Sequence, residues 1–239
     1  MRPDAAPGGG GSVVGGVGEL AAQVIVIAKE PLPGRVKTRL TPPFTPEEAA
    51  LLAEAALADT LAAVAAAPVA RRVLALAGRP GPWLPPGFDV IGQSGDGLDE
   101  RLGHAFADCF AGRALPMVLI GMDTPQVTPS LLTAAVRPLV AGKADAVFGP
   151  AADGGFWLLG LRRPDAALVA GVPMSTCDTG RRQLERLTAA GLRVHAVPEL
   201  TDVDTFAEAE RVAGAIPGSH FAEAFAGAFT SAAVHLASA

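Results

Sequence analysis

Short apolar segments rich in β-branched residues alternate along this chain with longer segments that favour helices. Residues 24–28 and 117–121 are uninterrupted apolar runs, which is typical of strands buried on both faces of a sheet. This alternation predicts an α/β fold, a Rossmann-like domain with a mostly parallel central sheet and helices on both faces. Further strands are expected at 71–77, 89–91, 144–148, 156–161 and 193–197, and helices at 46–66, 99–110, 129–141, 179–190, 206–213 and 221–236.

The chain of 239 residues divides by composition into three parts. Residues 1–22 are rich in glycine and contain too little apolar bulk to offset the entropy of ordering them, so we expect a disordered leader. Residues 23–214 carry the alternating pattern and form the predicted single domain. Residues 215–239 are expected to add a C-terminal helix.

Charge and cysteine content narrow the functional classes. The net charge of −5 argues against broad electrostatic attraction to nucleic acid, so any anion must be held by a local cluster. We find no apolar run close to the ~20 residues that span a bilayer, and expect no membrane contact. Cys109 and Cys177 are too few for a disulfide framework, which favours reduced thiols in a cytoplasmic protein. An enzyme or a binding protein for small molecules remains.

A basic loop follows the first predicted strand and contains Lys29, Gly34, Arg35, Lys37 and Arg39. In an extended backbone the side chains at 35, 37 and 39 point to the same side. Three like charges on one side are unfavourable unless an anion lies among them, and a glycine lets backbone N–H groups approach that anion closely. The loop therefore predicts a polyphosphate site, although a solvated basic loop is the alternative.

Two acidic motifs occur at predicted strand ends. Asp123 comes two residues after the apolar run 117–121, where a lone carboxylate needs a partner such as Mg²⁺ or Mn²⁺. Asp202 and Asp204 follow the last strand and are two residues apart, so both can face one cation. The alternative for each motif is local capping of a turn or a helix. Together they predict a divalent metal held by Asp123, Asp204 and Asp202.

Two glycine-rich turns complete the candidate site. Asp153 precedes two glycines and two aromatic residues, and could act in catalysis by binding an acceptor or its hydroxyl. Gln93 and Gly97 belong to a turn that enters the helix at 99–110 and could hold a base or ribose. A tight turn over core aromatics, and a plain loop, are the respective alternatives.

The segments IVIAKEPLPGRVKTRL, GMDTP, FGPAADGGFWLLGL, MSTCDT and ELTDVDT occur in this order within residues 24–212. In this they resemble the DUF2064 family of GT-A-like transferases. The resemblance implies glycosyltransferases associated with arsenosugar and radical-SAM gene clusters, and the family is similar to phospholactate guanylyltransferase and to the molybdenum-cofactor nucleotidyltransferases. The resemblance implies a single GT-A-like domain, a triphosphate grip at Lys37 and Arg39, and magnesium ligands at Asp123 and Asp204. Phe206 stands where the related motif has proline, which puts the start of the following helix and the role of Asp204 in doubt.

Three functions are compatible with these motifs. The first is a Mg²⁺-dependent nucleotidyltransferase, in which Lys37, Asp123 and Asp153 support transfer of NMP from an NTP to a small phosphate or phosphonate acceptor and pyrophosphate leaves. The second is a glycosyltransferase that uses a nucleotide-sugar, and the third is a non-catalytic nucleotide-binding module. The basic loop favours the first, because only an NTP offers a γ-phosphate. The nucleobase, the acceptor and the oligomeric state, a homodimer included, stay open.

Overall fold

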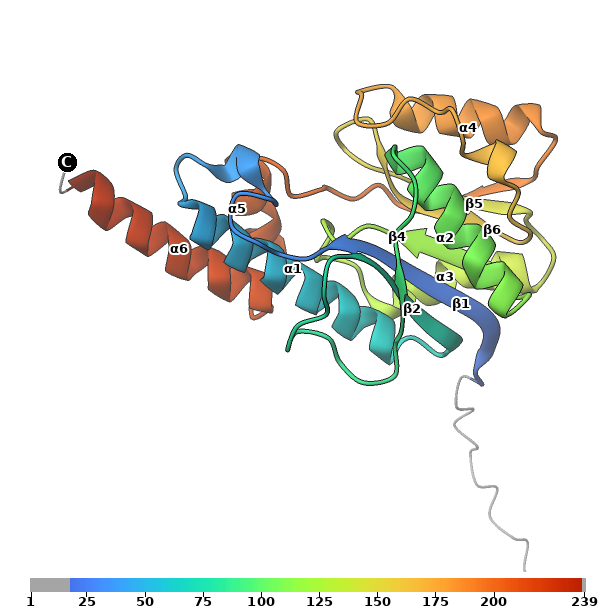
Figure 1. The fold of residues 1–239 in the computed structure, drawn as a ribbon, viewed down its shortest axis with the longest axis horizontal. Helices are drawn as coiled ribbons and strands as arrows, with labels where there is room; N and C mark the ends of the chain where they lie inside the picture. Colours follow the sequence, from blue (N-terminus) through green and yellow to red (C-terminus); the bar gives the residue numbers. More distant parts are fainter. Residues whose placement is uncertain (1–17, 238–239) are drawn as a thin grey trace, which may run out of the picture.

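The computed structural model describes residues 18–237, which form a seven-stranded sheet with helices around it (Figure 1). The strand order is β3-β2-β1-β4-β6-β5-β7, and β6 alone among these strands runs antiparallel to its neighbours, β4 and β5. The predicted mostly parallel α/β sheet is therefore confirmed. The strands are β1 (Leu20–Lys29), β2 (Val69–Ala77), β3 (Asp89–Gly92), β4 (Met117–Ile120), β5 (Ala146–Pro150), β6 (Phe156–Leu161) and β7 (Val194–Ala196).

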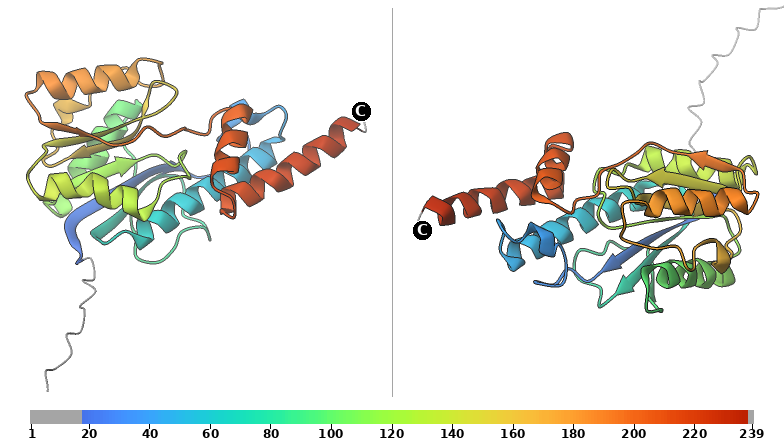
Figure 2. Two further views of the ribbon diagram at one scale, coloured as in Figure 1. Left: turned by 180° about the vertical axis from the view of Figure 1, so that it is seen from behind. Right: turned by 90° about the horizontal axis from the view of Figure 1, so that it is seen from above.

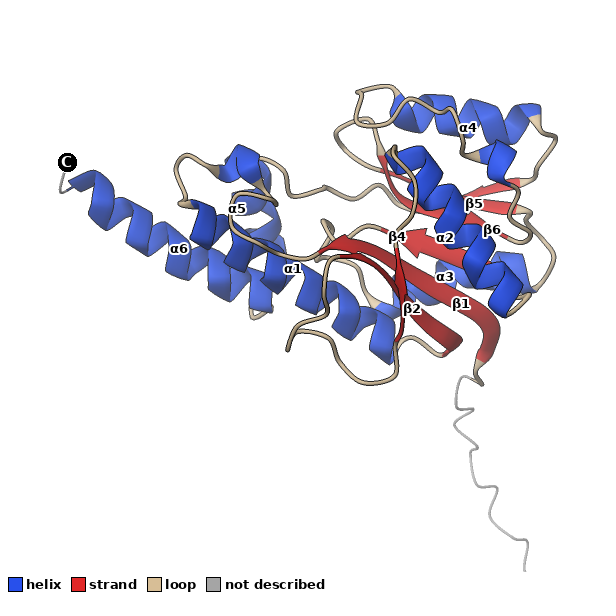
Figure 3. Ribbon diagram, in the orientation of Figure 1, coloured by secondary structure: helices blue, strands red, loops and turns tan. Residues whose placement is uncertain are grey.

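Helices cover both faces of the sheet, as Figures 2 and 3 show. Helices α1 and α3 pack on one face, and α2 and α4 pack on the other, each against alternate residues of the central strands. Apart from the start of β1, every predicted strand and helix ends within two residues of its observed bounds. The helices are α1 (Pro46–Ala66), α2 (Leu98–Gly112), α3 (Pro129–Val140), α4 (Thr179–Ala189), α5 (Phe206–Ala215) and α6 (His220–Ala237), with short 3-10 helices η1 (Thr38–Leu40) and η2 (Ala166–Leu168).

Helix α1 starts where a capping box fixes its first turn. The Thr45 hydroxyl accepts a hydrogen bond from the Glu48 amide at 3.2 Å, and the Glu48 carboxylate accepts one from the Thr45 amide at 2.8 Å. By length and mean hydropathy α1 could cross a membrane, contrary to the sequence expectation, because its alanines raise the hydropathy to 1.6. Within this fold 61% of that segment is buried, as in a core helix of a globular domain.

A third apolar cluster lies beyond the sheet, where α1 extends past the strand ends to meet α5 and α6 (Figure 1). Phe206 is partly buried and packs against it, with ring centroids 5.7 Å from both Phe44 and Phe225. The C-terminal helix therefore packs on α1 and α5 and completes the core at this end.

The first strand begins at Leu20, four residues before the predicted start. The predicted boundary of the leader at residue 22 is thus wrong, and residues 1–17 lie outside the described part of the chain. The sequence pattern missed this start because Gln23 is polar but fully buried. Its amide donates to the carbonyl of Arg113 at 2.9 Å, which satisfies a donor that would be costly to bury alone.

Candidate active site

Three segments distant in sequence meet at the carboxyl edge of the sheet. β1 and β4 are parallel neighbours with Val26 opposite Ile120, so the loops that follow them leave the sheet side by side. The segment 200–204 joins them because the Val203 amide donates to the carbonyl of Asp123 at 2.9 Å. Carboxyl edges of this kind are where ligands bind in open α/β sheets.

Lys37 lies at the junction of these segments. Its ammonium forms an ion pair with the Asp123 carboxylate, donates to the carbonyl of Val203 and lies 3.4 Å from Oδ1 of Asp204. The Lys37 side chain is only 4% exposed, whereas those of Asp123 and Asp204 are 41% and 40% exposed. The structure thus brings together three residues predicted for the site, with the cation buried and the acids facing solvent.

The predicted extended cation stripe is wrong. Residues 33–36 form a turn, Lys37 has a left-handed backbone with φ of 49°, and residues 38–40 form η1. The buried side chains of Val36 and Leu40 anchor this loop and turn Lys37 inward. Arg35 and Arg39 stay exposed, and Nη1 of Arg39 lies 3.5 Å from Oδ2 of Asp204.

Acidic groups outnumber cations at this junction. Burial lowers the pKa of Lys37, but the charges of Asp123 and Asp204 outweigh it and the net pKa is raised. Burial first, and then the charges of Asp123 and Asp153, raise the pKa of Asp202 to about 7. The carboxylates of Asp123, Asp153, Asp202 and Asp204 therefore influence one another, and the site can accommodate a further positive charge.

The predicted metal set is only partly assembled. Within residues 18–237 no group of three or more acidic, histidine or cysteine side chains is close enough to hold a metal together, so the Asp123, Asp202 and Asp204 triad is not preformed. The pair Asp123 and Asp204 is preformed around Lys37. In the described chain, Thr124 Oγ1 and Gln126 Oε1 are buried without a hydrogen-bond partner, and both belong to the loop that carries Asp123.

A capping box fixes the start of α5 at Thr205. This start was in doubt because Phe206 replaces the proline of the related motif. Thr205 Oγ1 accepts from the Glu208 amide at 3.4 Å, and the Glu208 carboxylate accepts from the amides of Thr205 and Asp204 at 2.7 and 3.0 Å. Phe206 fixes the helix by aromatic packing where proline would fix its backbone angle. The backbone of Asp204 is thereby held without the proline.

Asp153 lies in the turn between β5 and β6 and is exposed. Its carboxylate accepts a hydrogen bond from the Gly155 amide at 2.8 Å, which stabilises the turn itself. Gly154 has φ of +89° and lies so close to the turn that leads into α4 that a Cβ atom there would be 2.0 Å from the carbonyl oxygen of Cys177. The tight-turn interpretation of this motif is correct for its backbone, and a catalytic role for Asp153 stays a prediction.

The remaining nucleotide-binding candidates differ in their exposure and in the hydrogen bonds that they already make within the protein. Lys29 and Gly34 are exposed at the same edge, and Gly34 has φ of +72° with open space around it. The Gln93 amide donates to the carbonyls of Ala28 and Ala75 at 2.7 and 2.8 Å, so it ties together the ends of β1 and β2. Gly97 is the N-cap of α2. The Val203 carbonyl was not predicted as a partner of Lys37, because every residue type carries a backbone carbonyl and the sequence does not mark this one.

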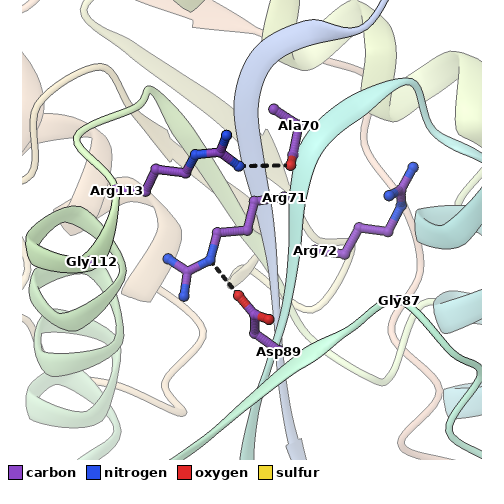
Figure 4. A pocket seen from close by; sticks show the side chains of 7 residues that line it. All are labelled: Ala70, Arg71, Arg72, Gly87, Asp89, Gly112 and Arg113. Carbon is purple, nitrogen blue, oxygen red and sulfur yellow. Dashed lines mark hydrogen bonds and ion pairs between the residues drawn. The ribbon is translucent and has the colours of Figure 1, made fainter.

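A hollow lies at the opposite, amino edge of the sheet, and Figure 4 shows its side chains. Arg71 donates to Asp89 at 2.7 Å and to the carbonyl of Cys109 at 3.2 Å. Arg72 donates to carbonyls at the end of α1, and Arg113 donates to a β2 carbonyl at 3.0 Å. These arginines bind carbonyls at helix ends and the carboxylate of an acid. Their contacts give the hollow a structural role. It is lined by Ala70, Arg71, Arg72, Gly87, Asp89, Gly112 and Arg113.

Comparison with known proteins identifies a family and a set of similar structures. A family model described as "Uncharacterized protein conserved in bacteria (DUF2064)" matches residues 52–176, which include Asp123 and Asp153. The chain is similar to a crystal structure of a candidate nucleotide-diphospho-sugar transferase from Desulfovibrio desulfuricans G20, at 27% identity and a TM-score of 0.77. That match covers 87% of this chain and 93% of the other, and indicates the GT-A-like fold.

More distant matches were also found. A nucleotidyl transferase from Methanothermobacter thermautotroptrophicus is 15% identical, with a TM-score of 0.48 over 80% of this chain and 95% of that one. The 2-C-methyl-D-erythritol 4-phosphate cytidylyltransferase from Thermus thermophilus is 16% identical, with a TM-score of 0.44 over 88% and 98%. No curated protein matches the sequence.

Proposed function

The chain belongs to the DUF2064 family, and we propose that it is a nucleotide-dependent transferase that transfers a nucleotidyl group from an NTP to a small acceptor. The observation that carries this proposal is the convergence of Lys37, Asp123 and Asp204 at the carboxyl edge of β1 and β4. A binding module that recognised only anions would not need two partly exposed acids next to its basic loop.

The acids fit a divalent cation. Asp123 and Asp204 already share one cationic partner, and neighbouring carboxylates leave the junction with excess negative charge. Mg²⁺ is commonly held by one or two carboxylates, with waters and substrate phosphates completing its coordination, so a third protein ligand is not required. When bound, the ion would neutralise charge on the donor phosphates.

In this reaction an acceptor oxygen forms a bond to the α-phosphorus while the bond to the bridging oxygen breaks and pyrophosphate leaves with the electron pair. Arg35 and Arg39 are the exposed cations on the loop after β1 and are suited to stabilise the departing pyrophosphate. Asp153, on the β5–β6 turn, would face the acceptor, where it could orient a hydroxyl or remove its proton.

Nucleotide binding is tested first by thermal unfolding with each NTP, NDP and common nucleotide-sugar, with and without Mg²⁺. A ligand at 100 times its Kd stabilises the folded state by about 2.7 kcal/mol. We expect Mg²⁺-dependent stabilisation by an NTP, which Asp123→Asn should abolish. If no nucleotide raises the unfolding temperature at millimolar concentration, the proposal is wrong.

The second candidate is glycosyl transfer from a nucleotide-sugar. It is favoured by the similarity to the Desulfovibrio structure described as a candidate nucleotide-diphospho-sugar transferase. Product analysis separates the two reactions, because nucleotidyl transfer releases pyrophosphate whereas glycosyl transfer releases a nucleoside diphosphate. Stabilisation by nucleotide-sugars and not by NTPs, with release of a nucleoside diphosphate, would replace the first candidate with the second.

A further inference from the structure

The ammonium of Lys37 has no donor left for a ligand. An ammonium group carries three N–H donors. Three protein oxygens surround it, from the carboxylates of Asp123 and Asp204 and the carbonyl of Val203. With the side chain 4% exposed, a phosphate arriving from solvent cannot reach the ammonium while these contacts last.

The contacts of Lys37 also show on which side of the two acids its ammonium lies. Lys37 meets Oδ1 of Asp123 and Oδ1 of Asp204, and the cation is buried whereas both acids are about 40% exposed. The ammonium therefore lies on the inner side of the pair. Among residues 18–237 the second oxygen of Asp204 meets only the solvent-exposed Arg39, at 3.5 Å, so the outer side of that acid stays accessible.

The backbone holds Lys37 in this position. A left-handed conformation is unfavourable for a residue with a Cβ atom, so the surroundings must impose φ of 49° at Lys37. Val36 and Leu40 are buried on either side of it, and the hydrogen bond from Val203 to Asp123 fixes the acceptors. The ammonium is thus positioned by the fold and not by a flexible surface side chain.

We infer that Lys37 is a positioning residue and not a phosphate ligand: it is the fixed counter-ion beneath Asp123 and Asp204. It allows two like-charged carboxylates to stay together before any ligand arrives, and it remains in place when a divalent cation binds their outer side. Phosphate contacts then fall to Arg35 and Arg39. This inference rests on the proposed function for the identity of the ligand that the acids receive.

Selective chemical labelling tests this position, because the chain contains lysine only at Lys29, Lys37 and Lys143. Lys29 and Lys143 are exposed and serve as internal controls. The full-length protein is acetylated with a small activated ester, with and without saturating Mn²⁺, and the modification rate of each lysine is measured by mass spectrometry. Mn²⁺ binding is followed in parallel by electron paramagnetic resonance.

We expect Lys37 to react at least tenfold more slowly than both controls, and to stay protected when Mn²⁺ is bound. If Mn²⁺ binds and Lys37 becomes as reactive as Lys29, the cation displaces the ammonium and the inference is wrong. If Lys37 is as reactive as the controls without metal, it is equally wrong. Failure of Mn²⁺ to bind counts against the metal in the proposed function, while protection of Lys37 still supports its buried position.

A set of variants separates a counter-ion from a phosphate ligand. The weaker, metal-free affinity for an NTP, which Arg35 and Arg39 should supply, is measured in EDTA at high ligand concentration for Lys37→Met in the native background and in Asp123→Asn/Asp204→Asn. A counter-ion is needed only while the acids are charged, so the variant should weaken binding in the native background and have less than a twofold effect in the double variant. A loss of tenfold or more in both backgrounds would assign Lys37 to the phosphates and overturn the inference.

Discussion

Replacing Gly154 by alanine should lower the free energy of unfolding for two separate reasons, because Gly154 lies in the turn that carries Asp153. Its φ of +89° costs a residue with a Cβ atom about 1–2 kcal/mol. The new atom would also lie 2.0 Å from the carbonyl oxygen of Cys177, and such overpacking costs about 1–3 kcal/mol. The free energy of unfolding should therefore fall by about 2–5 kcal/mol.

Gly191→Ala is the matched control. Gly191 has a similar φ of +74°, but nothing lies within 4 Å of the position of its Cβ atom. It should lose only the conformational part, about 1–2 kcal/mol. Urea unfolding of both variants measures the difference, which isolates the contact between Gly154 and Cys177. Equal losses in the two variants would refute the reasoning, because the turn would then not need to approach α4 so closely.

Three further changes test the site and the fold. Asp123→Asn should abolish Mg²⁺-dependent stabilisation by nucleotide and, because Lys37 keeps two other acceptors, lower the unfolding free energy by only about 1.5–3 kcal/mol in urea titrations. The folded-state pKa of Asp202 is raised to about 7 from 3.8, so the unfolded chain ionises first and stability falls as pH rises between these values. Asp202→Asn should therefore gain stability relative to the native protein at pH 8 and match it near pH 4; parallel pH profiles would contradict this. Thr45→Ala should cost about 0.5–2 kcal/mol in urea unfolding through loss of the α1 cap, without changing nucleotide affinity.

The layers of the fold could be read from the sequence because their signals are local. Helix α1 is marked by a threonine cap, a proline at its first position and acids in its first turn, and both of its observed ends agree with the prediction. The start of β1 could not be read in this way. Gln23 is acceptable in the core only because carbonyls at the end of α2 and beyond accept its hydrogen bonds, and these residues are about 90 positions away.

The candidate site shows the same division between local and distant causes. Strand ends and the alternation of acids correctly placed Asp123 and Asp204 at one edge, since β4 and β7, although not neighbours, run in the same direction in one sheet. The geometry of residues 33–40 was not predicted, because it depends on burying Val36 and Leu40 against residues from other segments. An extended loop and the observed turn with η1 fit the local pattern of charges equally well. Only tertiary packing decides between these two conformations.

The distance in sequence between Lys37 and its partners makes the basic loop depend on the C-terminal part of the domain. Val203 and Asp204 reach the site because residues 200–203 continue beside the end of β5, where the Ala152 amide donates to the carbonyl of Leu200 at 2.9 Å, and then bond to Asp123. Until that segment docks, Lys37 has only the carboxylate of Asp123, and burying a cation with one partner is unfavourable. The buried position of Lys37 is therefore stable only together with the segment that carries Val203 and Asp204. The capping box of α5 holds the backbone of Asp204, so it is as much a part of the site as the acids themselves.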